Sequence, residues 1–448
     1  STGSGFQVNA LDLKTGKLES GTPTTVSLGL RLALANRQVV LKLASPLTFD
    51  VSEQTFGLPN LVGQLDVADP ALPKGAVGMP IKGGLKGDLK AQEMSLTLSS
   101  AFEATRFSLA ANVTDFSKPA IKANLNADQL DLDALFPPKV TAMASGDDGA
   151  AKSIDTPVNL DFLRSLNLDL NAKVDRLVYS NVKLGQLKAH AVSKQGQLTV
   201  QPLSANLYGG TAVGSITVDA NSHAVSVKQK LTGVSIGPLL LDLLNKDMLA
   251  GNGDVNVDLR MQGKTVNQMK SAMNGSLAMV LSDGAVKGFN LGEQLRRAKA
   301  VLNAQANQTA ASDVAQKTDF SSMRVSFQIA NGVGRSNDLN LMAPLFRVGG
   351  QGQFDLVQSQ LDYTANATIV NTSKGQGGKT LDAGLKGLTV PVRIHGPFNN
   401  IQWELLLGQV AGQAAKDAVK ERFSPQIDEK RQELKDKARE AFKGLLQR

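Results

Sequence analysis

Strict alternation of apolar and polar residues is the feature that most constrains this chain. From Leu166 to Val174 an apolar side chain occupies every second position, with Asn, Asp and Lys between. The same period returns at residues 198–202, 225–227 and 255–261. A period of two puts apolar side chains on one face of an extended strand, whereas a helix requires a period of 3.6. Asp, Asn and Gly separate these segments, which is typical of hairpin turns. The sequence therefore predicts an antiparallel sheet with one apolar face.

The rest of the chain follows the same plan. Alternating segments run from residue 26 to 125 and again from 324 to 369 and 390 to 394. Helical spacing interrupts them at 239–244 and 291–302, and residues 131–136 predict one helical turn before Pro137. The predicted fold class is mainly β, with a few short helices.

Composition shifts divide the 448 residues into four predicted segments. Residues 1–136 form an N-terminal β segment, and 137–158, rich in small and polar residues, form a linker or long loop. Residues 159–404 form a second β segment, and 405–448 form a charged, amphipathic helical tail. One apolar stripe of the tail consists of Ile427, Leu434, Ala438, Ala441, Phe442 and Leu445. Such a helix either packs loosely on the sheet or contacts a membrane or a partner.

Several classes of function have no support in the sequence. The chain has no cysteine, which excludes thiol catalysis, cysteine-based metal sites and disulfides. Its three histidines, His190, His223 and His395, are far apart and lack metal-ligand spacing. The net charge of +8 is spread along the chain, without the basic stripe of a nucleic-acid binder. We therefore expect no enzyme, no cofactor, no metal and no nucleic-acid partner.

The apolar strand faces have two interpretations. In a sandwich, two sheets share a dry core. In the alternative, a single curled sheet leaves its apolar face open as a groove. Pattern alone favours the sandwich. The scarcity of helices that could cover a sheet, and an aromatic content of only 4%, reduce that preference.

Seven segments between residues 160 and 403 resemble the C-terminal region of AsmA-family proteins. They are residues 203–210 (LSANLYGG), 274–275 (NG), 283–291 (DGAVKGFNL), 318–322 (TDFSS), 331–332 (NG), 359–363 (SQLDY) and 390–397 (VPVRIHGP). The resemblance implies the groove: an elongated, curled antiparallel sheet with an open hydrophobic trough, similar to that of chorein-like bridge lipid transfer proteins. The alternating residues of the strands would line it. These groove candidates are Leu166, Leu168, Leu170, Val174, Val225, Val227, Val255, Val257, Leu259, Met261, Val325 and Phe327.

The resemblance also implies a function and a place. It implies a periplasmic protein of Gram-negative bacteria that shields phospholipid acyl chains in transit between the inner and outer membranes. An N-terminal helix, absent from this chain, would anchor the full-length protein to the inner membrane. The expected partners are phospholipids and the two membranes, and we expect a monomer. The alternative function is a structural or chaperone-like role in the assembly of outer-membrane proteins, which would then be partners.

Overall fold

A computed structural model describes the chain at residues 6–34, 37–69, 75–102, 105–135, 155–294, 308–311, 313–370 and 387–406. It divides into two compact units. Unit 1 comprises residues 1–284 and 325–334, and unit 2 comprises residues 285–324 and 335–448. The predicted segment boundaries at 136, 158 and 404 do not coincide with this division and stay predictions. The predicted helical tail lies in 407–448, outside the described residues.

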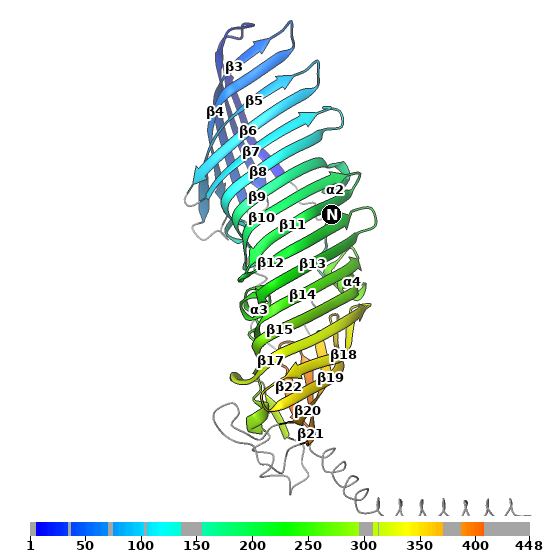
Figure 1. Cartoon of the computed structure of the whole chain (residues 1–448). Coiled ribbons are helices and arrows are strands. Elements are labelled where there is room, and N and C mark those ends of the chain that lie inside the picture. The colour runs from blue at the N-terminus through cyan, green and yellow to red at the C-terminus, as the bar shows by residue number, and fades with distance from the viewer. Residues whose placement is uncertain are drawn as a thin grey trace, which may run out of the picture. The chain divides into compact units, whose positions relative to one another are not determined.

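Strands dominate unit 1, as the alternation predicts (Figure 1). The strands are β1 (Phe6–Thr15), β2 (Thr24–Leu34), β3 (Arg37–Asp50), β4 (Thr55–Ala68), β5 (Ala76–Asp88), β6 (Glu93–Phe102), β7 (Thr105–Thr114), β8 (Ala120–Asp131), β9 (Asn167–Tyr179), β10 (Val182–Lys194), β11 (Gln197–Leu207), β12 (Gly210–Asp219), β13 (Ala224–Ser235), β14 (Leu249–Gln262) and β15 (Asn274–Gly288). The last of these continues into unit 2. The prediction of a mainly β, elongated, open sheet is confirmed.

Strand order in unit 1 follows the sequence. Consecutive strands pair antiparallel within the set β1 to β8, and again within the set β9 to β14. The join between the two sets differs, because β8 and β9 run parallel in a register from Ala120↔Asn167 to Asp131↔Val178. The prediction of a wholly antiparallel sheet is therefore wrong at this point. Parallel neighbours require a crossover of a dozen or more residues, and the chain between β8 and β9 supplies it.

The turns of unit 1 form two rims. Rim 1 holds the turns at 16–23, 51–54, 89–92, 115–119, 195–196, 220–223 and 263–273, and rim 2 holds those at 180–181, 208–209 and 236–248. Four short helices lie at these strand ends: α1 (Leu132–Leu135), α2 (Phe162–Ser165), α3 (Ile236–Leu244) and α4 (Val266–Ser271). The predicted helical segments at 131–136 and 239–244 are thus confirmed, and helix α1 and helix α3 both belong to rim 2.

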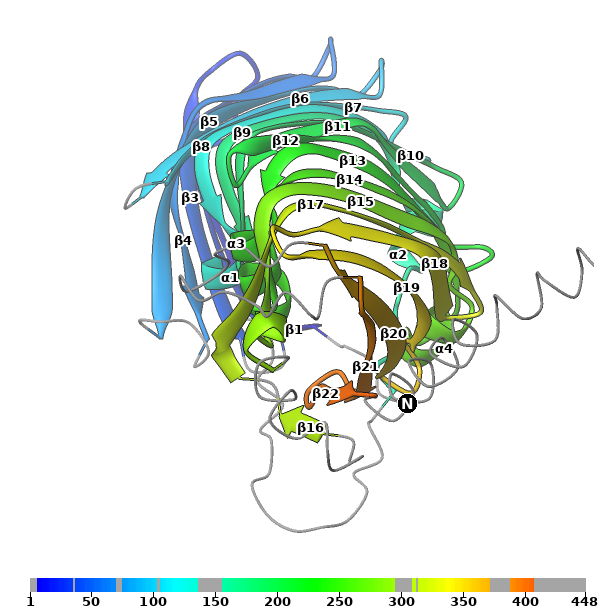
Figure 2. The same ribbon diagram turned by 60° about the horizontal axis from the view of Figure 1, so that its bottom comes forward.

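Glycines on the apolar side explain why the strands arch (Figure 2). A Cβ at Gly83 would lie 1.9 Å from the carbonyl oxygen of Thr97, and one at Gly214 would lie 2.0 Å from that of Lys228. Both glycines pair with apolar residues across the strands, so such a Cβ would point to the apolar side. Glycine at these positions lets the backbone of the neighbouring strand approach closely on that side. Gly29, on the opposite face, has nothing nearer than 3.5 Å. The apolar face is therefore the concave one.

Gly214→Val should destabilise unit 1, because its side chain has no space beside the Lys228 carbonyl. Overpacking of this kind typically costs about 1–3 kcal/mol. Gly29→Val is the matched control, since that site has space and a strand interior generally gains up to about 1 kcal/mol when glycine is replaced. Thermal unfolding of both variants, followed by circular dichroism, measures the difference. Equal melting temperatures would show that the bend does not depend on Gly214.

Unit 2 has a dry core. Its described strands are β16 (Gln308–Ala311), β18 (Val333–Met342), β19 (Phe346–Asp355), β20 (Gln360–Ile369), β21 (Thr389–Pro397) and β22 (Gln402–Leu405), together with most of β17 (Asp313–Ala330). The alternating residues of β20 and β21 are buried here, and Ile369, Val390 and Leu405 are each only 1% exposed. Trp403 stacks on Phe289 with ring centroids 4.8 Å apart. The frayed helix or loop predicted at 303–317 is instead strand over 308–311 and from 313 onward.

Candidate functional site

Three rows of side chains cross unit 1 on its concave side, perpendicular to the strands. The first runs through paired residues from β3 to β14: Phe49, Phe56, Gly87, Met94, Val113, Ile121, Leu168, Ser193, Leu198, Val218, Val225 and Met261. The second runs from β4 to β14: Leu58, Leu85, Leu96, Ala111, Ala123, Leu170, Ala191, Val200, Ile216, Val227 and Leu259. The third is Leu61, Gly83, Leu98, Leu109, Leu125, Ala172, Ala189, Leu203, Gly214, Gln229 and Val257. We call the three rows together the apolar face.

The apolar face is long and scarcely interrupted by polar groups. Ser193 and Gln229 are its two polar side chains, and charged side chains are absent from the three rows. At about 4.8 Å per strand, the row from β3 to β14 extends over about 50 Å. One leaflet of a bilayer has a hydrocarbon thickness of only about 15 Å. The face is thus about three acyl chains long.

Most side chains of the apolar face are half-buried. In the second row Ala123 is buried and the others are intermediate, while their neighbours along each strand are mostly exposed. The strands of unit 1 make their main contacts with their sheet neighbours, and all the described strands belong to one continuous sheet. Burial of this degree without a covering layer is what a concave surface produces. Unit 1 is therefore a groove, and the sandwich interpretation does not describe it.

The structure brings seven of the predicted groove residues together on this face. They are Leu168, Leu170, Val225, Val227, Val257, Leu259 and Met261. Val174 and Val255 are only 3% and 8% exposed, so they pack within the protein. Val174 belongs to a cluster with Ala127 and Leu177. Leu166 lies between α2 and β9 rather than in a row. Val325 is buried and Phe327 half-buried in β17, outside the three rows.

The N-terminal half of the apolar face was missed as a site. Residues such as Leu96, Leu109 and Ile121 show the same alternation as the predicted ones, and that signal was available. The sequence does not indicate that these residues continue the face formed by β9, because that continuity depends on the parallel pairing of β8 and β9. The strands from β3 to β8 therefore contribute as much of the face as β9 to β14.

Unit 1 has cavities at both rims. One of about 910 Å³ adjoins rim 2, where its apolar lining includes Leu130, Leu177, Leu184 and Leu207. The other, of about 800 Å³, adjoins rim 1 between β3 and β8. Its lining consists mainly of residues that alternate with the first row along the strands, among them Lys86, Ser95 and Asn112.

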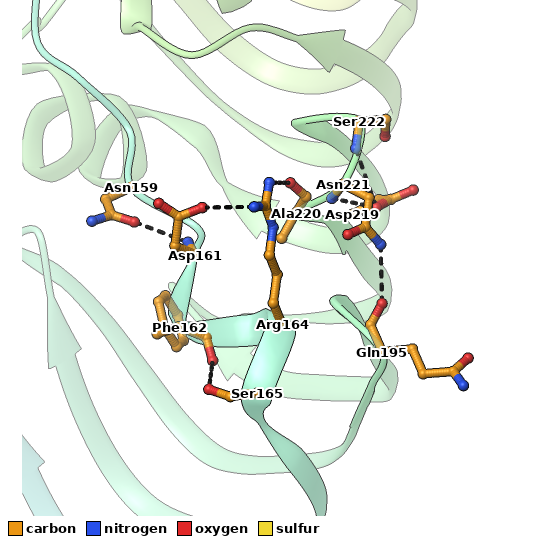
Figure 3. Close-up of polar contacts among 10 residues, drawn as sticks. All are labelled: Asn159, Asp161, Phe162, Arg164, Ser165, Gln195, Asp219, Ala220, Asn221 and Ser222. Carbon is orange, nitrogen blue, oxygen red and sulfur yellow. Dashed lines mark hydrogen bonds and ion pairs between the residues drawn. The ribbon is translucent and has the colours of Figure 1, made fainter.

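Residues 155–166 form a strap along rim 1 from β14 back to β9. The strap begins at β14, where the Val158 amide donates to the Lys264 carbonyl at 2.9 Å. It ends in α2, whose Arg164 donates through Nη2 to the Ala220 carbonyl at 3.2 Å (Figure 3). Leu163 of this helix is 1% exposed, and Ala220 is fully buried. Ser193 of the first row is also fully buried, and helix α2 contacts its strand. The strap therefore covers rim 1 from β10 onward.

Helix α3 is fastened along rim 2 by a polar cluster. Asp242 of this helix accepts a hydrogen bond from the Tyr208 hydroxyl at 2.7 Å and an ion pair from Lys183 at 3.0 Å. Partial burial, followed by the bond to Asp242, raises the pKa of Tyr208 to about 12. The bonds from Tyr208 and Lys183 lower the pKa of Asp242. The helix is thus held to β10 and to the turn between β11 and β12.

Two of the three histidines lie beside acidic residues. His190 pairs with Asp169 at 2.9 Å, and His395 lies 3.8 Å from Glu404. Within the described ranges, no group of three His, Cys, Asp or Glu side chains could hold a metal ion. Across those same ranges, no helix is long and apolar enough to cross a membrane.

The fold and the face together define a class: an open β-sheet protein with a continuous apolar groove. Comparison with known proteins gives the family. The AsmA family profile matches residues 57–339, which is more than half of the chain, and the chain belongs to the AsmA family. It is similar to Protein AsmA of Escherichia coli (strain K12), at 23% identity over 340 residues. That match covers 70% of this chain and 52% of the relative, so the chain spans about half of the relative's length.

Proposed function

We propose that unit 1 binds the acyl chains of phospholipids along its apolar face and carries them between the inner and outer membranes of a Gram-negative bacterium. The observation that carries the proposal is the run of three half-buried apolar rows on one continuous sheet. A surface of this length without charge suits an extended hydrocarbon ligand. Membership of the AsmA family supports the same function, and a periplasmic location is part of the proposal.

The mechanism is passive. Each methylene removed from water stabilises the complex by about 0.8 kcal/mol, wherever along the face it lies. Because the rows repeat the same kind of side chain from β3 to β14, a bound chain meets similar surroundings at every position. Lipids can therefore slide while their headgroups stay in water. The direction of movement comes from a source outside unit 1.

The experiment is to purify the chain, extract it with organic solvent and measure phospholipid per chain by mass spectrometry. We expect at least one phospholipid per chain, and more than one when lipid is supplied in excess, since the face is about three acyl chains long. A chain that carries no phospholipid, even after loading from detergent, would contradict the proposal. The alternative role in outer-membrane protein assembly would then be the one to test.

A further inference from the structure

The cavity of about 910 Å³ at rim 2 has an apolar side and a polar side. It lies where the strands from β8 to β12 end or begin, so two neighbouring rows of cross-strand pairs both line it. The apolar row consists of Leu130, Leu177 and Leu184. The polar row consists of Gln129, Arg176, Gly185, Asn206 and Thr211. A ligand in this cavity can therefore contact hydrocarbon and polar groups at once.

The apolar side of the cavity is continuous with the apolar face. Ala127 and Val174 pair with each other on β8 and β9, two positions beyond the third row. They form a buried cluster with Leu177 of the cavity lining, and the partly buried Phe107 and Leu187 pack against this cluster. Apolar side chains therefore continue from the third row to the cavity.

Three of the described residues that line the cavity are charged: Asp131, Arg176 and Lys183. The ammonium of Lys183 is already paired with Asp242 at 3.0 Å. Arg176 is exposed, and within the described part of the chain its side chain has neither a hydrogen bond nor an ion pair. Asp131 is also exposed, and its Oδ1 accepts the Ala134 amide at 2.8 Å. One guanidinium and one carboxylate oxygen thus remain available to a ligand.

The residue opposite Arg176 on β10 leaves its charge uncovered. This residue is Gly185, which has no side chain to lie against the guanidinium. Crowding does not require glycine here, because a Cβ at this position would have nothing nearer than the Cβ of Asn206 at 3.6 Å. The space beside Arg176 is therefore open on the side of the cavity that Asn206 and Thr211 line.

Arg176 and Asp131 are close enough to contact one small ligand together. They lie on neighbouring strands and two positions apart in register, since Asp131 pairs with Val178. With about 4.8 Å between strands and about 3.3 Å per residue, their Cα atoms are about 8 Å apart. A guanidinium is well suited to a phosphate, and a carboxylate accepts hydrogen bonds from an ammonium. Phosphatidylethanolamine carries both groups, separated by two carbon atoms, together with acyl chains.

We infer that the cavity at rim 2 is a headgroup site for phosphatidylethanolamine, in which Arg176 binds the phosphate and Asp131 binds the ammonium. The acyl chains lie on the apolar row and continue onto the third row. The inference rests on the proposed function, and it adds one place on a uniform apolar surface where a headgroup is recognised. A volume of about 910 Å³ is within the range of about 300–1,000 Å³ that is usual for small-ligand sites.

Headgroup preference tests the role of Asp131. The purified chain is mixed in detergent with equal amounts of phosphatidylethanolamine and phosphatidylglycerol, at less than one lipid per chain, so that the tightest site fills first. By mass spectrometry we expect about threefold to fivefold more phosphatidylethanolamine than phosphatidylglycerol on the parent chain, which is the effect of one exposed ion pair. Asp131→Asn keeps an oxygen acceptor for the Ala134 amide and should hold the two lipids equally.

The outcomes of this experiment separate the headgroup site from the proposed function. A parent chain that holds both lipids equally, or an Asp131→Asn chain that keeps the parent's preference, would overturn the headgroup site and leave the proposed function standing. A parent chain that holds neither lipid would reject the proposed function itself.

A second measurement tests Arg176. Arg176→Gln should lower the affinity for phosphatidylethanolamine, titrated over the same range, by about fivefold. Arg31→Gln is the matched control, because Arg31 is exposed on β2 and does not line the cavity, and it should keep the parent's affinity. Excess glycerol 3-phosphate, which has a phosphate but no acyl chain, should displace no lipid. Equal affinities of the two variants, or displacement by glycerol 3-phosphate, would overturn the inference.

Discussion

Leu259→Glu should leave the chain folded and lower its bound phospholipid. Leu259 ends the second row, opposite Val227 on β13, and its side chain is half-buried on the concave side. In the empty groove the carboxylate is solvated by water, so we expect only a small fall in melting temperature. A bound acyl chain would exclude that water, and burying a charge costs several kcal/mol. Since about 1.4 kcal/mol corresponds to a tenfold change in affinity, the affinity for an acyl chain at this end of the face should fall by at least tenfold.

Asn256→Glu is the matched control for this variant. Asn256 lies on the same strand, is exposed, and stands opposite Lys230 on the other face of the sheet. Phospholipid per chain, measured by mass spectrometry, should match that of the parent chain. If Leu259→Glu retains the parent's phospholipid content while folded, the β14 end of the second row is not part of the binding surface.

Ala367→Glu should have the opposite result and unfold unit 2. Ala367 is fully buried in β20, between Val348 and Val390 on the neighbouring strands. A carboxylate there has neither water nor a partner, and the several kcal/mol that this costs is comparable with a typical domain stability of about 5–15 kcal/mol. Trp403, the chain's one tryptophan, reports on this unit because it stacks on Phe289. Its fluorescence should shift to the red in the variant.

Asn366→Glu, one position away and exposed, should leave this fluorescence unchanged. The substitutions in the two units thus test one distinction: an apolar face that can take up water and one that cannot. A folded Ala367→Glu chain with native tryptophan emission would show that unit 2 is also open.

Sequence alone could not make that distinction. Val390 and Val392 stand two positions apart on one strand just as Val225 and Val227 do, yet the first pair is buried in a core and the second half-buried in a groove. Alternation fixes which residues share a face of a strand, because that is a local property. Whether anything covers the face depends on packing between distant segments, such as the pairing of β16 with β22. The strands and seven groove residues were therefore predictable, and the core of unit 2 was not.

The contacts of the rim elements could not be predicted from the sequence either. The aspartates at positions 50, 88, 115 and 219 each precede a short turn, and their recurrence is visible in the sequence. Val51, after the first of them, is 67% exposed, whereas Ala220, after the last, is fully buried where the strap reaches it through Arg164, 56 residues away in the sequence. The cluster of Tyr208, Asp242 and Lys183 likewise joins three separate elements. Contacts of this range carry no local periodic signal.

The parallel join of β8 and β9 has a consequence for synthesis on the ribosome. Each other strand from β1 to β14 can pair with the strand made just before it, so the sheet can grow hairpin by hairpin, and such local pairing favours fast folding. Strand β8 ends at Asp131 and β9 at Tyr179, 48 positions later. At about 5–20 residues per second, the free edge of β8 waits about 2–10 s for its partner. During that interval it is an unpaired edge strand, open to pairing with a neighbouring nascent chain.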